Sequence, residues 1–155
     1  MPTSFQRLEL LSQQIHQANR AAVGAELAQR GLSEVNPLIL AILKHVEQIQ
    51  PQSFSQRDLA RMLEISPAAV TNSLKSMERS GYISREPERG DARRNRIALT
   101  EKGRAAVEGC EAAFQTVAQR MLASFSQEEQ EQLAEFRMRM LNNLRGEFPV
   151  SKEEP

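Results

Sequence analysis

Apolar residues recur at intervals of three and four along most of the chain, which predicts an almost entirely helical protein. Leu8, Leu11 and Ile15 illustrate this spacing, because they fall on one face of the first expected helix. The long helices expected from this spacing cover residues 4–29, 34–49, 101–124 and 127–145. The second of these has two candidate N-caps, Ser33 and Asn36, and the choice between them stays open. Ser126 with Glu129 is a capping-box pattern that predicts the start of the last one.

The middle of the chain predicts two shorter helices joined by a tight turn. Ser55 is a capping residue for the first helix. Ser66 followed by Pro67 predicts the start of the second, because proline lacks the N–H that a first helical position leaves unpaired. Gly81 is expected to end it. Three apolar residues at positions i, i+4 and i+7 predict its buried face: Val70, Leu74 and Met77.

Two strand candidates follow these helices. Tyr82–Glu86 and Arg94–Leu99 are short and alternating, and the turn-rich residues 87–91 join them into a hairpin. A helix, a tight turn, a second helix and a hairpin, in this order, are the plan of a winged helix-turn-helix. We therefore expect a mainly α fold (α+β) with a small antiparallel β-hairpin wing. The expected domain covers residues 1–155, and its winged part covers residues 34–104.

The charged residues are unevenly distributed, although the formal net charge of the chain is zero. Residues 55–104 hold 11 basic and 7 acidic residues, whereas the remainder holds 9 basic and 13 acidic residues. Five of the twelve residues from Arg85 to Arg96 are arginine. A segregated positive segment attracts a polyanion while the rest of the protein repels it, so this distribution favours nucleic acid as the partner of the winged part.

Other classes of function find little support in the sequence. One cysteine and two histidines cannot make a zinc finger, and there is no phosphate-binding loop or nucleophile with a base. We therefore expect no enzyme activity, no cofactor and no metal. The longest apolar run, residues 38–43, is far too short to span a bilayer, and the N-terminus lacks a signal-peptide pattern. We expect a cytoplasmic protein without a membrane partner.

The second short helix is expected to present a small and polar outer face to DNA, since this helix of a helix-turn-helix lies in the major groove. Asn72 suits an adenine edge, Thr71 a thymine methyl or a phosphate, and Lys75 and Arg79 phosphates or guanine. The DNA-contacting residues expected on this helix are Ser66, Ala68, Ala69, Thr71, Asn72, Lys75, Ser76 and Arg79. The wing arginines expected to reach a minor groove are Arg89, Arg93 and Arg94. An ordinary solvated helix face is the alternative, and the arginine-rich wing favours DNA.

A set of residues in the wing and the helices before it has the spacing of a known family. The wing residues are Asp91-Ala92-Arg93, Ile97, Leu99-Thr100 and Gly103. The upstream residues are Leu59-Ala60, Ser66-Pro67, Val70, Leu74, Glu78 and Gly81-Tyr82-Ile83. In these positions the chain resembles the MarR (multiple-antibiotic-resistance regulator) family. The similarity extends over nearly the whole chain, and its specific motifs lie in the central fifty residues.

The resemblance implies a homodimeric bacterial transcription factor, usually a repressor that a small molecule or oxidation releases from DNA. It implies that Arg93 reaches the minor groove and that Asp91 helps to hold it. The recognition helix departs from the common pattern, since Asn72 stands where arginine is common and Ser76 where a basic residue is frequent. The family's operator preference is therefore not carried over to this chain.

Helices at both ends of the chain carry apolar stripes that one winged domain cannot cover. Twofold symmetry also suits two half-sites of a pseudo-palindromic duplex, about one DNA turn apart. We therefore expect residues 4–30 and 101–146 to form dimerisation helices, with a monomeric helical bundle as the alternative. The expected interface or core residues are Leu8, Leu11, Ile15, Phe125, Leu133, Phe136, Met140, Leu141 and Leu144.

The resemblance further implies an effector pocket where the dimerisation helices meet the winged part, suited to a small aromatic or anionic molecule. The residues expected near it are His16, Arg20 and His45. Each has a simpler alternative as an exposed or structural side chain, and for the two histidines that alternative is favoured. Cys110 offers a redox-responsive alternative, but no neighbouring cation lowers its pKa. A winged helix that binds protein instead of DNA is the remaining alternative, and it needs no arginine-tipped wing.

Overall fold

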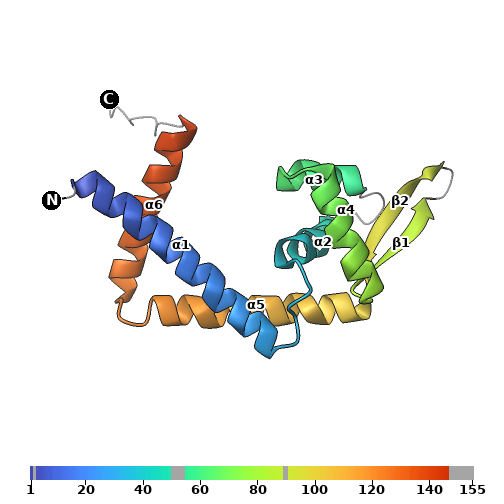
Figure 1. Cartoon of the computed structure of the whole chain (residues 1–155), viewed down its shortest axis with the longest axis horizontal. Helices are drawn as coiled ribbons and strands as arrows, with labels where there is room; N and C mark the ends of the chain where they lie inside the picture. Colours follow the sequence, from blue (N-terminus) through green and yellow to red (C-terminus); the bar gives the residue numbers. More distant parts are fainter. Residues whose placement is uncertain (2, 50–54, 89–90, 147–155) are drawn as a thin grey trace, which may run out of the picture. The chain divides into compact units, whose positions relative to one another are not determined.

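The structure, a computed structural model, describes residues 1, 3–49, 55–88 and 91–146, and the side chains of residues 87–95 lie outside this description. The described elements are α1 (Ser4–Gln29), α2 (Pro37–Ile49), α3 (Gln56–Leu63), α4 (Pro67–Arg79), β1 (Ile83–Glu88), β2 (Asp91–Leu99), α5 (Glu101–Met121) and α6 (Gln127–Arg145) (Figure 1). The predicted mainly helical fold with one antiparallel hairpin is confirmed. Among the described residues, no helix combines the length and the apolar composition needed to cross a membrane.

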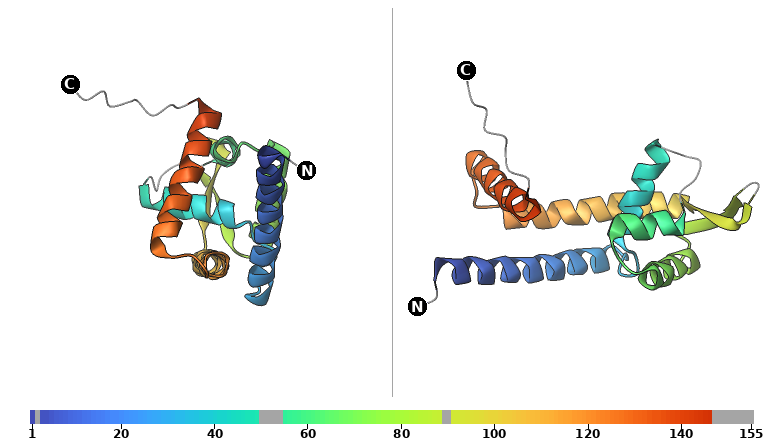
Figure 2. Two further views of the ribbon diagram at one scale, coloured as in Figure 1. Left: turned by 90° about the vertical axis from the view of Figure 1, so that its left-hand side faces the viewer. Right: turned by 90° about the horizontal axis from the view of Figure 1, so that it is seen from above.

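The chain divides into two compact units, residues 1–117 and residues 118–155, and their boundary falls within α5. In the first unit α2, α3 and α4 form one group, and the hairpin of β1 and β2 extends from it (Figures 1 and 2). The second unit contains the end of α5 and the whole of α6, which has no buried residue. The candidate DNA-contacting residues therefore all belong to the first unit.

Local hydrogen bonds determine where the helices begin. The side-chain Oδ1 of Asn36 accepts hydrogen bonds from the backbone N–H groups of Leu38 at 3.1 Å and Ile39 at 3.2 Å. Asn36 is thus the cap of α2, and the helix begins at Pro37 instead of near residue 34. Capping boxes begin three further helices, with Thr3, Ser55 and Ser126 as their N-caps. The last two were expected from the sequence.

One hydrophobic core joins α1, the winged part and α5 as far as Val117. Its largest fully buried side chains are Ile39, Leu40, Leu43, Leu59, Val70, Leu74 and Met77. Further buried residues come from α1 and α5 and include Val23, Leu27, Ala106, Cys110, Ala113 and Val117. Burying one such aliphatic side chain is worth about 1.5–3 kcal/mol relative to its exposure, so this core stabilises the platform on which α4 lies.

The hairpin is longer than the alternation of its side chains predicts. The strands pair antiparallel from Ile83↔Leu99 to Glu88↔Asp91, with an irregularity between Pro87 and Glu88. The predicted strand bounds were therefore wrong at the tip of the hairpin, since β1 extends to Glu88 instead of Glu86 and β2 begins at Asp91 instead of Arg94. Alternation marks only the part of the hairpin with one buried face, where Ile83, Ile97 and Leu99 are buried. Backbone pairing continues beyond it.

A hydrogen bond connects Thr100, just before α5, to Gly81, just after α4. The hydroxyl of Thr100 donates to the carbonyl of Gly81 at 2.6 Å and accepts from the N–H of Gly103 at 3.0 Å. A Cβ on Gly103 would lie 2.0 Å from the carbonyl oxygen of Tyr82, so this approach requires glycine. At its other end α5 stops at Met121, three residues before the predicted end.

Candidate nucleic-acid interface

Helix α4 has one buried and one exposed face. Val70, Leu74 and Met77 have no exposed surface, which confirms the predicted inward orientation. Ser66 caps the helix by accepting the N–H of Ala69 at 3.2 Å. The exposed residues of α4 include Ala68, Ala69, Asn72, Lys75 and Arg79. This outer face combines small side chains, one amide and two cations, so its chemistry matches that of a helix in a DNA groove.

Thr71 is less free than its position on the helix predicts. It is half-buried, its hydroxyl donates to the carbonyl of Pro67 at 2.8 Å, and it accepts a hydrogen bond from Nε2 of Gln56 on α3. The proton of this hydroxyl is therefore already used in a hydrogen bond within the protein. The methyl group of Thr71 and one lone pair of its hydroxyl oxygen remain without a hydrogen-bond role among the described residues. Nothing in the local sequence pattern couples residues 56 and 71, which is why Gln56 was missed.

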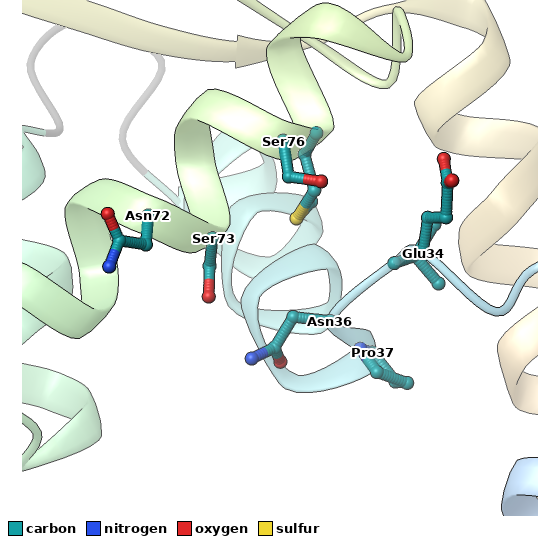
Figure 3. Close-up of a pocket in the computed structure, with 8 residues that line it drawn as sticks. Glu34, Asn36, Pro37, Asn72, Ser73 and Ser76 are labelled. Carbon is teal, nitrogen blue, oxygen red and sulfur yellow. The ribbon is translucent and has the colours of Figure 1, made fainter.

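A cavity of about 480 Å³ lies between α4 and the segment that leads into α2. Its lining residues are Glu34, Val35, Asn36, Pro37, Asn72, Ser73, Ser76 and Met77. Figure 3 shows Asn72, Ser73 and Ser76 along α4, with Asn36 and Pro37 across from them. The volume is typical of small-molecule pockets. Asn72 and Ser76 were expected to contact DNA. The structure shows that Asn36 and Ser73, which were not predicted as site residues, line the same cavity.

The lining of this cavity is mostly neutral. Its charged member is Glu34, and a carboxylate oxygen of Glu34 accepts a hydrogen bond from the hydroxyl of Ser80 at 3.0 Å. The two amides and two hydroxyls of Asn36, Asn72, Ser73 and Ser76 can pair with neutral donors and acceptors. Any group seated in the cavity would touch the side chains that we expect to contact DNA.

The base of the wing is joined to both helices of the helix-turn-helix by Arg85 of β1. Its Nε lies 3.0 Å from a carboxylate oxygen of Glu78 on α4, and its Nη1 donates to Oε1 of Gln56 on α3 at 3.3 Å. The side chain of Arg85 is only 18% exposed. Arg89 lies outside the described residues, as do the side chains of Asp91, Arg93 and Arg94. Their expected DNA contacts stay predictions.

Comparison with known proteins identifies the family. The family model described as MarR family matches residues 26–94, which covers α2, α3, α4, β1 and the start of β2. The chain belongs to the MarR family. It is 34% identical over 114 residues to an uncharacterised HTH-type transcriptional regulator of Bacillus subtilis, YdgJ. That match covers 74% of this chain and 66% of the relative, just under two thirds of its length.

Solved structures of MarR-family regulators extend the likeness to most of the chain. A mutant of MepR from Staphylococcus aureus has a TM-score of 0.72 and 26% identity, covering 92% of this chain and 99% of that protein. The complex of S. aureus MepR with DNA has a TM-score of 0.63 and 27% identity, covering 88% and 98%. A putative MarR-family regulator from Clostridium acetobutylicum has a TM-score of 0.64 and 25% identity, covering 88% and 98%. The family and these relatives are transcriptional regulators and not enzymes.

The expected effector residues of this MarR-family chain lie on two helices. His16 and Arg20 are exposed on α1, and His45 is exposed on α2. The cavity beside α4 is lined by other residues. An effector pocket at His16, Arg20 and His45 stays a prediction.

Cys110 is a buried thiol of the core, 4% exposed. Burial, and secondarily the negative charge of Glu111, raises the pKa of this thiol. A raised pKa lowers the thiolate population, and the thiolate is the form that oxidants attack. The environment of Cys110 therefore argues against the redox-responsive alternative.

The residues expected at a MarR-type dimer interface are mostly exposed in the single chain. On α1 these are Leu8, Leu11 and Ile15, and the others are Phe125, Phe136, Met140, Leu141 and Leu144. Leu133 is partly buried. Exposed aliphatic and aromatic side chains in this number are typical of surfaces that another chain covers.

Proposed function

We propose that this protein is a sequence-specific DNA-binding transcriptional regulator, a homodimeric repressor that a small-molecule effector releases from DNA. The observation that carries the proposal is the outer face of α4. Asn72, Lys75 and Arg79 are exposed there, while the opposite face of the helix is fixed in the core. Membership of the MarR family and the likeness to MepR in its complex with DNA support the same assignment.

In the proposed complex α4 lies in the major groove. Asn72 pairs with a base edge, and an Asn side chain suits adenine because it offers one donor and one acceptor. Lys75 and Arg79 neutralise phosphates, which releases counterions and makes affinity depend on salt. Arg93 of the wing enters the adjacent minor groove, where the negative potential favours a guanidinium, and Asp91 helps to hold it.

Dimerisation supplies the second half-site. Two copies of α4 related by twofold symmetry contact two half-sites about one DNA turn apart, which requires a pseudo-palindromic operator. The exposed apolar stripes on α1 and α6 support a second copy of the chain as the partner of these helices. A bacterial cytoplasm is the proposed location, since the regulators from Bacillus subtilis and Staphylococcus aureus that it resembles are bacterial and its proposed partner is the chromosome.

The test is a gel-shift titration with duplex DNA from the promoter of the protein's own gene, repeated between about 50 and 200 mM salt. Saturable binding, with log affinity falling linearly as log salt rises, is the expected result. No duplex binding at the lowest salt would overturn the proposal and leave a protein-binding winged helix.

The effector is tested separately with small aromatic acids. A compound that raises the melting temperature of the free protein and also releases the bound duplex is the expected result. Compounds that raise the melting temperature without releasing DNA would contradict the repressor-release mechanism and leave DNA binding intact.

A further inference from the structure

Arg85 links three elements of the winged part through one guanidinium. It originates on β1, its Nε lies 3.0 Å from Oε2 of Glu78 on α4, and its Nη1 donates to Gln56 on α3 at 3.3 Å. Its Nε and Nη2 have no exposed surface and make no hydrogen bond to any described residue, so the contact with Glu78 is an ion pair and the hydrogen bond of this guanidinium is the one to Gln56. The guanidinium therefore faces the protein, unlike the exposed cations Lys75 and Arg79 on α4.

Gln56 carries this link to the recognition helix. Its Oε1 accepts from Arg85, and its Nε2 donates to the hydroxyl of Thr71. A side-chain amide has its acceptor on one atom and its donors on the other, so Arg85 and Thr71 together select one orientation of this amide. The hydroxyl of Thr71 in turn donates to the carbonyl of Pro67 at 2.8 Å. The rotamer of Thr71 is thus held at both of its hydrogen bonds.

We propose that Arg85 is a positioning residue for DNA recognition: acting through Gln56, it fixes Thr71 of α4 relative to the base of the wing. The discrimination between base pairs next to Thr71 then depends on a guanidinium that makes no phosphate contact. This inference rests on the proposed function, since it concerns how α4 and the wing engage one duplex.

The fork geometry of arginine is what the network requires. Arg85 contacts Glu78 and Gln56 through two different nitrogens, and a lysine ammonium cannot reproduce this planar arrangement on two elements. Arg85→Lys therefore keeps the charge while it removes the link. Gln56→Ala removes the link while it leaves the Arg85–Glu78 ion pair in place.

The experiment determines base preference from a randomised duplex library, together with affinity, salt slope and melting temperature, for the full-length protein. Arg85→Lys and Gln56→Ala are each expected to reduce discrimination at the base pairs next to Thr71 by roughly 3–10-fold. The salt slope is expected to stay at the wild-type value, because no phosphate contact is lost. Thr71→Val removes the hydroxyl, and Gln56→Ala is expected to have no further effect in that background.

Ser84→Ala is the matched control, since Ser84 is the neighbour of Arg85 on β1 and points to the other face of the strand. It is expected to keep the wild-type preference. If the Arg85→Lys protein does not fold, the base preference of Gln56→Ala alone tests the positioning role. If Arg85→Lys and Gln56→Ala both keep the wild-type base preference, the positioning role of Arg85 is overturned. The proposed function would still stand in that case, provided that the wild-type protein binds duplex DNA. Arg85→Gln removes the charge, and a salt slope reduced by about one in that variant would instead identify a direct phosphate contact. A wild-type protein that binds no duplex would overturn both proposals.

Discussion

Similar apolar residues are buried in the winged region (residues 37–99) and exposed on two terminal stretches, residues 4–15 of α1 and helix α6. In the winged region Leu59 and Leu74 have no exposed surface. On the terminal helices Leu11 is 43% exposed and Leu144 is 88% exposed. The spacing of three and four is the same in both regions. Helical spacing thus tells which residues share a face, but it does not tell whether the same chain covers that face.

The difference separates two sources of stability. The winged region shares one buried core with the end of α1 and with α5, so its packing is complete within one chain. The exposed leucines of α1 and α6 gain burial only when a second surface covers them, and that part of the stability depends on protein concentration. The following predictions test this division, from the largest expected effect to the smallest.

Leu74→Ala is expected to lower the free energy of unfolding by about 2–5 kcal/mol, because it leaves a cavity in a fully packed core. Urea denaturation at two protein concentrations measures the loss, which should be the same at both. Leu10→Ala is the matched control, since Leu10 is 56% exposed and outside the expected interface. Its effect should stay within about 0.5 kcal/mol. Equal losses of unfolding free energy in Leu74→Ala and Leu10→Ala would contradict the difference in burial between the winged region and α1.

Leu11→Glu combined with Leu141→Glu is expected to convert a dimer into a monomer. Each leucine loses about 1.5–3 kcal/mol of burial, so the dimer dissociation constant should rise at least about a hundredfold. Sedimentation at micromolar concentration measures the change, and circular dichroism should still report a folded helical chain. Leu10→Glu serves as the control. A wild-type protein that already sediments as a monomer would contradict the dimer.

Asn72→Ala is expected to relax base preference at one position by about 1–3 kcal/mol. Its side chain is exposed, so the free energy of unfolding should change by no more than about 0.5 kcal/mol. Arg93→Ala should instead weaken binding to all sequences and reduce the salt slope by about one. Selection from a randomised library, with titrations at several salt concentrations, distinguishes these outcomes. An unchanged preferred sequence in Asn72→Ala would show that α4 is oriented differently on DNA.

Alkylation of Cys110 is expected to be slower than that of a free thiol at about pH 8, because the pKa of the buried thiol is raised. The sign of the pH dependence follows from the same shift. The neutral thiol is favoured in the fold, so its contribution to stability is present below the ordinary thiol pKa and is lost as pH rises through the raised pKa. Reaction with iodoacetamide across a pH series measures the alkylation rate of Cys110. A rate equal to that of a free thiol would contradict the burial.

The sequence predicted those parts of the fold that depend on nearby residues. The caps Ser55, Ser66 and Ser126 and the inward stripe of Val70, Leu74 and Met77 are all confirmed. Each depends on hydrogen bonds or spacing within four residues, which a single sequence displays. The strand ends and the end of α5 were predicted less well, because pairing across a hairpin and fraying of a helix leave no distinct local pattern.

The sequence by itself thus determined which side of α4 faces the core and which side chains lie on its outer face, since helical geometry relates residues three and four apart. Only the tertiary structure decided which of those side chains are already engaged. Thr71 is bound by Gln56, fifteen residues away, and Gln56 by Arg85, twenty-nine residues away. The cavity beside Asn72 likewise exists because residues 34–37 pack near α4. These contacts join separate elements, so they arise only when the common core brings α3, α4 and β1 together.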